Sequence, residues 1–194
     1  MQARTRHVTN KALLAGLLLA ISISDPSPAA AASACEAQIL RASQRYDIPP
    51  GILYAVGLTE TGRKGSLQPY ALNIAGKAVF APDKQAAIRI FNKARRDGVK
   101  LIDLGCMQIN HHYHAAHFRS VGDMLDPRRN VDYAARFLRE LRKDHGSWSM
   151  AVARYHAGPD NDPAQKRYVC RVITNMVATG FGSWTEKARR FCHS

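Results

Sequence analysis

An almost entirely apolar segment constrains the fold of this chain most strongly. Residues 51–60 follow Pro49 and Pro50 and precede Gly62, and these residue types commonly begin and end helices. Apolar side chains would occupy nearly the whole circumference of that helix. A helix of this kind is stable only when neighbouring elements cover most of its surface. The sequence therefore predicts a buried central helix.

Helical periodicity continues on both sides of this segment, and a small β element interrupts it. Short apolar runs at residues 70–74 and 77–80 flank Ala75 and Gly76, which is typical of a hairpin. The expected fold class is α+β, predominantly α-helical, with one small β-hairpin. Further helices are expected over residues 36–46, 83–97, 126–146, 148–156, 163–179 and 184–192.

The beginning of the chain has the pattern of an export signal. Basic residues among the first eleven positions precede an uncharged stretch, residues 12–23, that is short for a bilayer span. Small residues then run up to Cys35 and supply Ala-x-Ala cleavage sites. We predict a signal peptide over residues 1–34 and a single mature domain over residues 35–194, with no membrane span after cleavage. An uncleaved anchor and a lipid-modified Cys35 are the alternatives.

The chain is strongly basic, with 28 Lys+Arg against 15 Asp+Glu and a formal charge of +13. The predicted leader holds little of this excess, so the charge belongs to the mature domain. A charge of this size favours a polyanionic partner. Because the chain is expected in the periplasm or outside the cell, nucleic acid is not the expected partner, and anionic components of the envelope remain.

Cysteine usage agrees with export. The predicted mature domain contains four cysteines, an even number with no Cys-x-x-Cys pair, which is typical of disulfides in an oxidising compartment. Three pairings are possible. One of them joins Cys170 to Cys192 within the last helical segments and leaves Cys35 with Cys106.

Glu60 stands at the C-terminal end of the apolar helix. Burial there disfavours the carboxylate, and the negative end of the helix dipole disfavours it as well. A carboxyl group that stays protonated near neutral pH can donate a proton to a leaving sugar oxygen. Glu60 is therefore a candidate general acid, and the alternative is a solvated glutamate that merely ends the helix.

Four short motifs, in a fixed order, give Glu60 a context. They read Glu60-Thr61-Gly62, Gly105-Cys106-Met107-Gln108-Ile109-Asn110, Asp126-Pro127-Arg128-Arg129-Asn130 and Ala153-Arg154-Tyr155-His156-Ala157-Gly158. In this order the sequence resembles the lysozyme-like soluble lytic transglycosylases over about residues 48–168. It is most similar to small, single-domain members that are associated with cell-envelope machines. The resemblance implies a lysozyme-like fold with the hairpin beside the cleft.

The resemblance also implies a reaction and a set of site residues. Glu60 would act as acid and then as base, cleaving the β-1,4 bond between N-acetylmuramic acid and N-acetylglucosamine without water and leaving a 1,6-anhydro product. No cofactor and no metal are implied. The partners would be peptidoglycan strands and a secretion, conjugation or flagellar complex. Thr61, Met107, Gln108, Asn130 and Tyr155 would bind or position the saccharide, and a hydrogen bond from Tyr155 to Glu60 is expected.

Three features depart from the family pattern. Thr61 replaces a serine and keeps a hydroxyl group, whereas His156 replaces an asparagine. The spacing from Glu60 to Gln108 is longer than in compact members, because a hairpin and a helix lie between them. This insertion is expected beside the cleft, where it would shape substrate access.

Three other functions compete with this interpretation. A lysozyme-type hydrolase would need a second carboxylate, for which Asp83, Asp97 and Asp103 are candidates that no motif marks. A catalytically silent scaffold that binds peptidoglycan is the second alternative. A zinc site is the third, but its histidines lack an HExxH pattern and an acidic ligand nearby in the sequence. The histidines concerned are His111, His112, His114 and His117.

Overall fold

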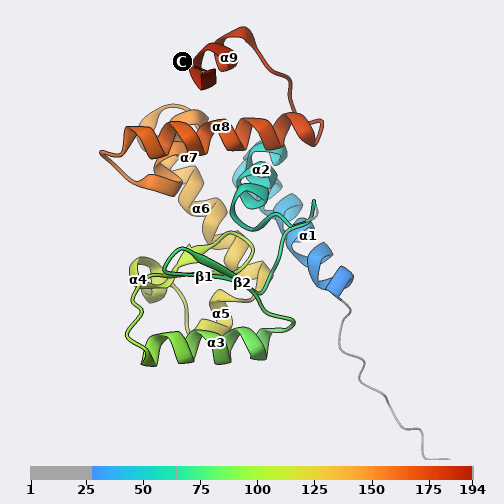
Figure 1. The fold of residues 1–194 in the computed structure, drawn as a ribbon. Helices are drawn as coiled ribbons and strands as arrows, with labels where there is room; N and C mark the ends of the chain where they lie inside the picture. Colours follow the sequence, from blue (N-terminus) through green and yellow to red (C-terminus); the bar gives the residue numbers. More distant parts are fainter. Residues whose placement is uncertain (1–27, 64, 194) are drawn as a thin grey trace, which may run out of the picture.

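Helices make up most of this computed structural model, which describes residues 28–63 and 65–193 (Figure 1). The prediction of a signal peptide over residues 1–34 lies largely outside the described residues, and residues 28–34 begin the first helix. The helices are α1 (Pro28–Tyr46), α2 (Pro50–Thr61), α3 (Lys84–Arg96), α4 (His111–His114), α5 (Val121–Met124), α6 (Pro127–His145), α7 (Trp148–Ala157), α8 (Asp162–Ala178) and α9 (Glu186–His193), with the short 3-10 helix η1 (Ala115–His117).

The predicted central helix is confirmed as α2. Leu53, Ala55 and Val56 are completely buried, and α2 packs between α1 on one side and α8 on the other. Pro50 occupies its first turn, where a missing backbone N–H costs nothing. The helix ends where the N–H of Gly62 donates to the carbonyl of Leu58. Because apolar side chains surround α2, the helix is buried, and its last turn lies inside the molecule.

A small antiparallel sheet lies at the side of the helices (Figure 1). The predicted hairpin is confirmed, but the sheet has two further strands that the sequence analysis missed. These strands contain only three and two residues, which is too short for an alternating pattern to be read. The strands are β1 (Ala71–Ile74), β2 (Lys77–Phe80), β3 (Ile102–Leu104) and β4 (Ile109–Asn110), in the spatial order β2-β1-β3-β4.

The strand register gives the sheet an apolar face and a polar face. Leu72, Leu104 and Ile109 lie opposite one another on β1, β3 and β4, and all three are buried in the core. Because side chains alternate along a strand, their neighbours form a polar row on the other face. That row consists of Asn73, Asp103 and Asn110.

Helix α3 lies at the end of the molecule opposite α8 (Figure 1). Asp83 caps it by accepting a hydrogen bond from the N–H of Ala86 at 2.7 Å, as expected for the predicted helix over residues 83–97. Its apolar side chains pack against β1 and α5. The insertion between Glu60 and Gln108 therefore contributes the hairpin of β1 and β2 and the helix α3 that packs against it.

Helices α6, α7 and α8 form a consecutive set in which each packs against the next, and α6 also packs against α1. Asp126 caps α6, and Gly146 ends it with a positive φ of 75°, a conformation that glycine adopts without strain. The predictions for these three helices are confirmed, as is the prediction of a predominantly helical α+β fold. The short helices α4 and α5 were not predicted.

Two disulfides hold the ends of the described chain. Cys35 pairs with Cys106 and Cys170 with Cys192, which selects one of the three pairings that the sequence left open. The second bond attaches α9 to α8, and none of the described side chains of α9 is buried. Within residues 28–63 and 65–193, no helix has the length and apolar character needed to cross a membrane.

Candidate active site

Glu60 lies in the last turn of α2 with 14% of its side chain exposed. Its Oε1 accepts a hydrogen bond of 2.5 Å from the hydroxyl of Tyr168, which comes from α8 and is completely buried. The ring of His156 stacks on Tyr168 with centroids 4.2 Å apart and an interplanar angle of 4°. The Nδ1 of His156 is 3.9 Å from the same Oε1. Three helices therefore meet at one carboxyl group.

The pKa of Glu60 is raised to about 7, above the usual range of a carboxyl group. Burial is the largest cause, and the negative charge of Asp103 adds to it. The hydrogen bond from Tyr168 and the charge of Arg171 act in the opposite direction because they favour the carboxylate. A carboxyl group with such a pKa can both release and accept a proton near neutral pH.

Tyr168 is suited to remain a hydrogen-bond donor to this group. Burial, followed by the charge of Glu60, raises the pKa of its hydroxyl well above the ordinary value. Tyr168 is the last residue of the family resemblance and was not among the site residues expected from the sequence. A tyrosine within the apolar stripe of a helix has no local signal that separates a site residue from a core residue.

A tight loop, residues 105–108, faces the end of α2. Gly105 has a positive φ of 79°, and a Cβ there would lie 2.6 Å from the Nδ2 of Asn130, so this position requires glycine. Asn130 is completely buried. Its Nδ2 donates to the carbonyls of Leu104 and Met124, and its Oδ1 accepts from the N–H of Met107 at 2.8 Å. All these contacts are to the backbone, so Asn130 holds the loop in place from within the core.

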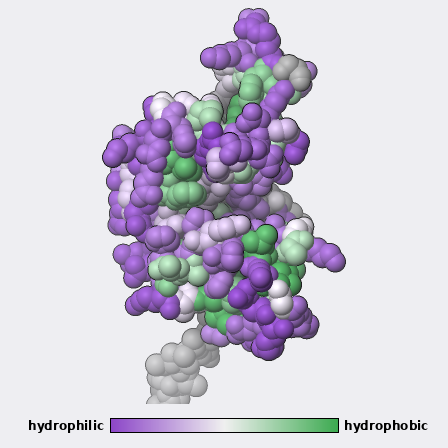
Figure 2. Space-filling model, turned by 90° about the vertical axis from the view of Figure 1, so that its left-hand side faces the viewer, coloured by the Kyte–Doolittle hydropathy of each residue, from purple (hydrophilic) through white to green (hydrophobic). Residues whose placement is uncertain are grey.

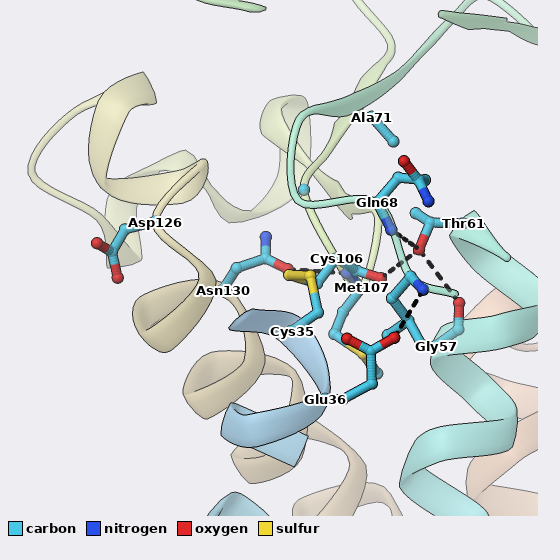
Figure 3. The surroundings of a disulfide bond; sticks show 12 residues. Cys35, Glu36, Gly57, Thr61, Gln68, Ala71, Cys106, Met107, Asp126 and Asn130 are labelled. Atoms are coloured by element: carbon cyan, nitrogen blue, oxygen red, sulfur yellow. Dashed lines mark hydrogen bonds between the residues drawn. A yellow bond between two sulfur atoms is a disulfide. The ribbon is translucent and has the colours of Figure 1, made fainter. Parts of the chain in front are cut away.

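Thr61 and Met107 also belong to this support (Figure 3). Thr61 is 3% exposed, and its hydroxyl donates to the carbonyl of Cys106 at 2.9 Å. Met107 has no exposed surface. The Cys35–Cys106 disulfide joins the same loop to α1. Thr61, Met107 and Asn130 are thus all buried, and the hydrogen bonds that Thr61 and Asn130 make go to the backbone. Their contacts with a saccharide stay a prediction.

Gln108 is the partly exposed side chain of the loop. Its φ of 46° is in the left-handed region, which non-glycine residues rarely adopt and which occurs often at functional sites. Its Nε2 donates to the carbonyl of Gly105 at 3.0 Å and to that of Ala71 at 3.2 Å. The amide group is therefore held by the loop and by β1.

Tyr155 lies close to Glu60 but does not make the predicted hydrogen bond. Its hydroxyl donates to the carbonyl of Met107 at 2.8 Å, and Tyr168 takes the place at the carboxyl group. Burial and the charge of Glu60 raise the pKa of Tyr155 well above its usual value. Tyr155 thus connects α7 to the loop through this hydrogen bond.

Asp103 is the second acidic group of the site. It lies on the polar face of β3, where its Oδ1 accepts from the Nδ2 of Asn110 at 2.6 Å, and burial raises the pKa of its carboxyl group. Its charge in turn raises the pKa of Glu60. The other two acids considered from the sequence lie elsewhere: Asp83 caps α3, and Asp97 pairs with Lys93 at 2.6 Å.

The four clustered histidines lie in or next to α4 and η1. The Nδ1 of His114 is 2.7 Å from the hydroxyl of Tyr133, and the ring of His111 packs on Phe91 with centroids 4.7 Å apart. Across the described ranges, no three His, Cys, Asp or Glu side chains are grouped so that they could hold a metal ion.

Comparisons with known proteins address the family. Searches of curated proteins and of solved structures found no match. The family model described as the transglycosylase SLT domain matches residues 37–175, which is most of the chain and includes Glu60, the loop and Tyr168. The protein therefore belongs to the SLT family of peptidoglycan lytic transglycosylases.

Proposed function

We propose that this protein is an exported lytic transglycosylase that cleaves the glycan strands of peptidoglycan with Glu60 as its only acid and base. The observation that carries the proposal is the state of this carboxyl group. It is nearly buried, has a pKa of about 7 and holds a hydrogen bond from Tyr168. Family membership supplies the substrate class.

In the first step, protonated Glu60 transfers its proton to the oxygen of the β-1,4 bond between N-acetylmuramic acid and N-acetylglucosamine. The bond from this oxygen to C1 of the muramoyl residue breaks, and N-acetylglucosamine leaves with the proton. The acetamido group of the substrate stabilises the positive charge that develops at C1. Tyr168 stabilises the carboxylate that Glu60 becomes, because its hydroxyl continues to donate.

In the second step, the Glu60 carboxylate takes the proton of the muramoyl 6-hydroxyl group. The freed oxygen forms a bond with C1 of the same sugar and closes a 1,6-anhydro ring. The carboxyl group is then protonated again, and no water is consumed. A pKa of about 7 suits both proton transfers, because neither form of Glu60 is strongly preferred at neutral pH.

The neighbouring residues would contribute in two ways. Gln108 is partly exposed at the loop and would hydrogen-bond the sugar or its acetamido group through its amide oxygen. Asn130, Thr61 and Met107 would fix the loop that presents Gln108. Tyr155 would hold the same loop from α7.

A lysozyme-type hydrolase is a second candidate, because Asp103 is a half-buried acid whose charge reaches Glu60. In that reaction Asp103 would act as nucleophile or as base for water. Family membership favours the transglycosylase, in which Asp103 would act only through its negative charge, which raises the pKa of Glu60.

The products distinguish these candidates. Purified residues 35–194 are incubated with sacculi, and the released muropeptides are separated and weighed. A transglycosylase releases 1,6-anhydro ends, which are lighter than reducing ends by one water. Reducing ends alone would assign the reaction to the hydrolase, and an absence of release under all conditions would favour the silent scaffold. The matched control is Glu60→Gln, which is expected to abolish release and to leave sacculus binding intact.

Export and assembly are also part of the proposal. The leader over residues 1–34 and service to an envelope-spanning secretion, conjugation or flagellar complex rest on the sequence pattern and the family resemblance. N-terminal sequencing of the protein recovered from the periplasm tests the first, with Cys35 as the expected first residue. Recovery of an intact N-terminus would contradict cleavage.

A further inference from the structure

A cavity of about 640 Å³ lies between α7, α8 and α9, and His156 in its wall separates it from Glu60. One wall is the Cys170–Cys192 disulfide, which attaches α9 to α8. Another wall is His156, whose ring stacks on Tyr168 and whose Nδ1 is 3.9 Å from the carboxyl group of Glu60. Figure 1 shows α9 beyond α8 at the end of the molecule, away from the sheet. The cavity therefore adjoins the site through a single side chain.

The walls of this cavity are strongly cationic. Lys166, Arg167 and Arg171 line it from successive turns of α8, and none of the lining residues that the structure describes is acidic. Arg167 and Arg171 are exposed and stand four positions apart on the helix, where two like charges destabilise it. An anion bound between them would remove this repulsion. Figure 2 shows hydrophilic and hydrophobic side chains together at this end of the molecule, where α9 protrudes.

The cationic wall is coupled to the reacting group. The guanidinium group of Arg171 is 5.6 Å from the centre of the Tyr168 ring, and its charge lowers the pKa values of Glu60 and His156. An anion in the cavity would offset that charge and favour the protonated form of Glu60. Binding of an anion in the cavity would thus raise the pKa of Glu60.

The volume suits a short peptide better than a single ion, because ligand cavities of several hundred Å³ hold molecules of drug size. In peptidoglycan, the muramoyl sugar carries a short peptide with free carboxylate groups, joined through its lactyl ether. That peptide starts from the sugar whose C1 would react at Glu60, and it must leave the site on one side. The cavity beside Glu60 has the charge and the position to receive it.

We propose that the cavity between α8 and α9 binds the carboxylate groups of the stem peptide on the muramoyl residue that is cleaved. Arg167 and Arg171 provide the charge, and the Cys170–Cys192 disulfide holds the far wall in place. This proposal rests on the proposed function for its substrate, and it adds a preference for strands that carry peptides over bare glycan.

The test compares two substrates and two variants. The substrates are glycan strands with intact stem peptides and the same strands after an amidase has removed the peptides. Arg167→Gln removes one charge from the cavity, while Arg41→Gln removes the same charge from an exposed position on α1. Arg167→Lys keeps the charge and serves as the rescue variant.

We expect Arg167→Gln to raise KM for peptide-bearing strands by about twofold to fivefold, as for the loss of one exposed ion pair, and to leave kcat nearly unchanged. Cleavage of bare strands should not change, and Arg41→Gln should resemble the wild type on both substrates. Arg167→Lys should recover most of the loss. The proposal would be overturned if Arg167→Gln and Arg41→Gln had equal effects, or if Arg167→Gln affected both substrates equally. Either result would mean that the basic residues act only by general electrostatic steering.

A binding measurement separates this proposal from the reaction itself. Glu60→Gln protein is sedimented with peptide-bearing strands and with bare strands, and the bound fractions are compared. Preferential binding of peptide-bearing strands that is lost in Glu60→Gln/Arg167→Gln supports the peptide site even if the wild type cleaves nothing. Equal binding of both kinds of strand would overturn the peptide site even if the wild type releases anhydro products.

Discussion

The hydrogen bond between Tyr168 and Glu60 sets the balance between the two protonation states on which the proposed reaction depends. Burial alone would push the pKa of Glu60 further upward, and the hydroxyl group of Tyr168 limits the rise. Glu60 could be identified from the sequence because its position at the end of an apolar helix has a direct electrostatic consequence. Tyr168 could not, because its partner is 108 positions away in the sequence.

Tyr168→Phe should raise the pKa of Glu60 further, because it removes a donor to the carboxylate and keeps the ring that stacks on His156. The protonated form would then persist to higher pH, so the alkaline limb of the pH profile of kcat/KM should move to higher pH. We expect kcat to fall by about tenfold or more, as for the loss of a hydrogen bond to a charged group. An unchanged pH profile would show that Tyr168 only packs against Glu60.

Glu60→Gln should stabilise the fold at alkaline pH. The raised pKa means that the folded state binds the proton of Glu60 more tightly than the unfolded state does. This stabilising contribution is complete below pH 4.5, is lost as pH rises to about 7, and amounts to about 3 kcal/mol. Glutamine stays neutral, so the variant should exceed the wild type in Tm at pH 8 and match it near pH 4. Equal Tm differences at both pH values would contradict the raised pKa.

At the scale of elements, the loop over residues 105–108 is held by four other elements. Asn130 holds it from α6, Thr61 from the end of α2, Tyr155 from α7, and the Cys35–Cys106 disulfide from α1. The long helices, their caps and the hairpin could be predicted because each has periodicity or turn residues of its own. Strands β3 and β4 could not be predicted, because they are too short to show a pattern. Their conformation depends on pairing with β1 and on the loop between them.

Asn130→Ala should test this account of the loop. It would remove the side-chain hydrogen bonds to the N–H of Met107 and to the carbonyls of Leu104 and Met124 inside the core. We expect a loss of about 2–4 kcal/mol in the free energy of unfolding, measured by urea denaturation, and a loss of muropeptide release. Asn130→Asp keeps the acceptor for the N–H of Met107 but turns a carboxylate oxygen toward the carbonyls of Leu104 and Met124, so it should cost at least as much as alanine. A variant with normal stability but weakened saccharide binding would instead make Asn130 a substrate contact.

At the scale of the whole molecule, the two disulfides have different tasks. Cys35–Cys106 spans 71 positions and joins α1 to the loop beside Glu60, whereas Cys170–Cys192 spans 22 positions and attaches a helix without buried side chains. The even number of cysteines predicted both bonds, but the pairing required the fold. The site itself depends on α2, α7 and α8 meeting at one carboxyl group, which no single segment of sequence reveals.

Removing each disulfide by paired serine substitutions should separate these tasks. Loss of Cys35–Cys106 should cost about 4 kcal/mol in the free energy of unfolding and lower activity on every substrate. Loss of Cys170–Cys192 should cost up to about 3 kcal/mol by the same reasoning, and proteolysis should first remove the segment that contains α9. Activity on bare glycan strands should persist in the second variant. Its loss there would make α9 part of the core of the enzyme.

The origin of the oxygen atoms in the products tests the central claim most directly. Sacculi are digested in water enriched with heavy oxygen, and the released muropeptides are analysed by mass spectrometry, with Glu60→Gln as the blank. Glu60 acting as acid and then base closes an internal ring, so the wild type should release 1,6-anhydro products without the heavy label. Release of reducing ends that carry the label at C1 would show that water is the acceptor and would contradict the account.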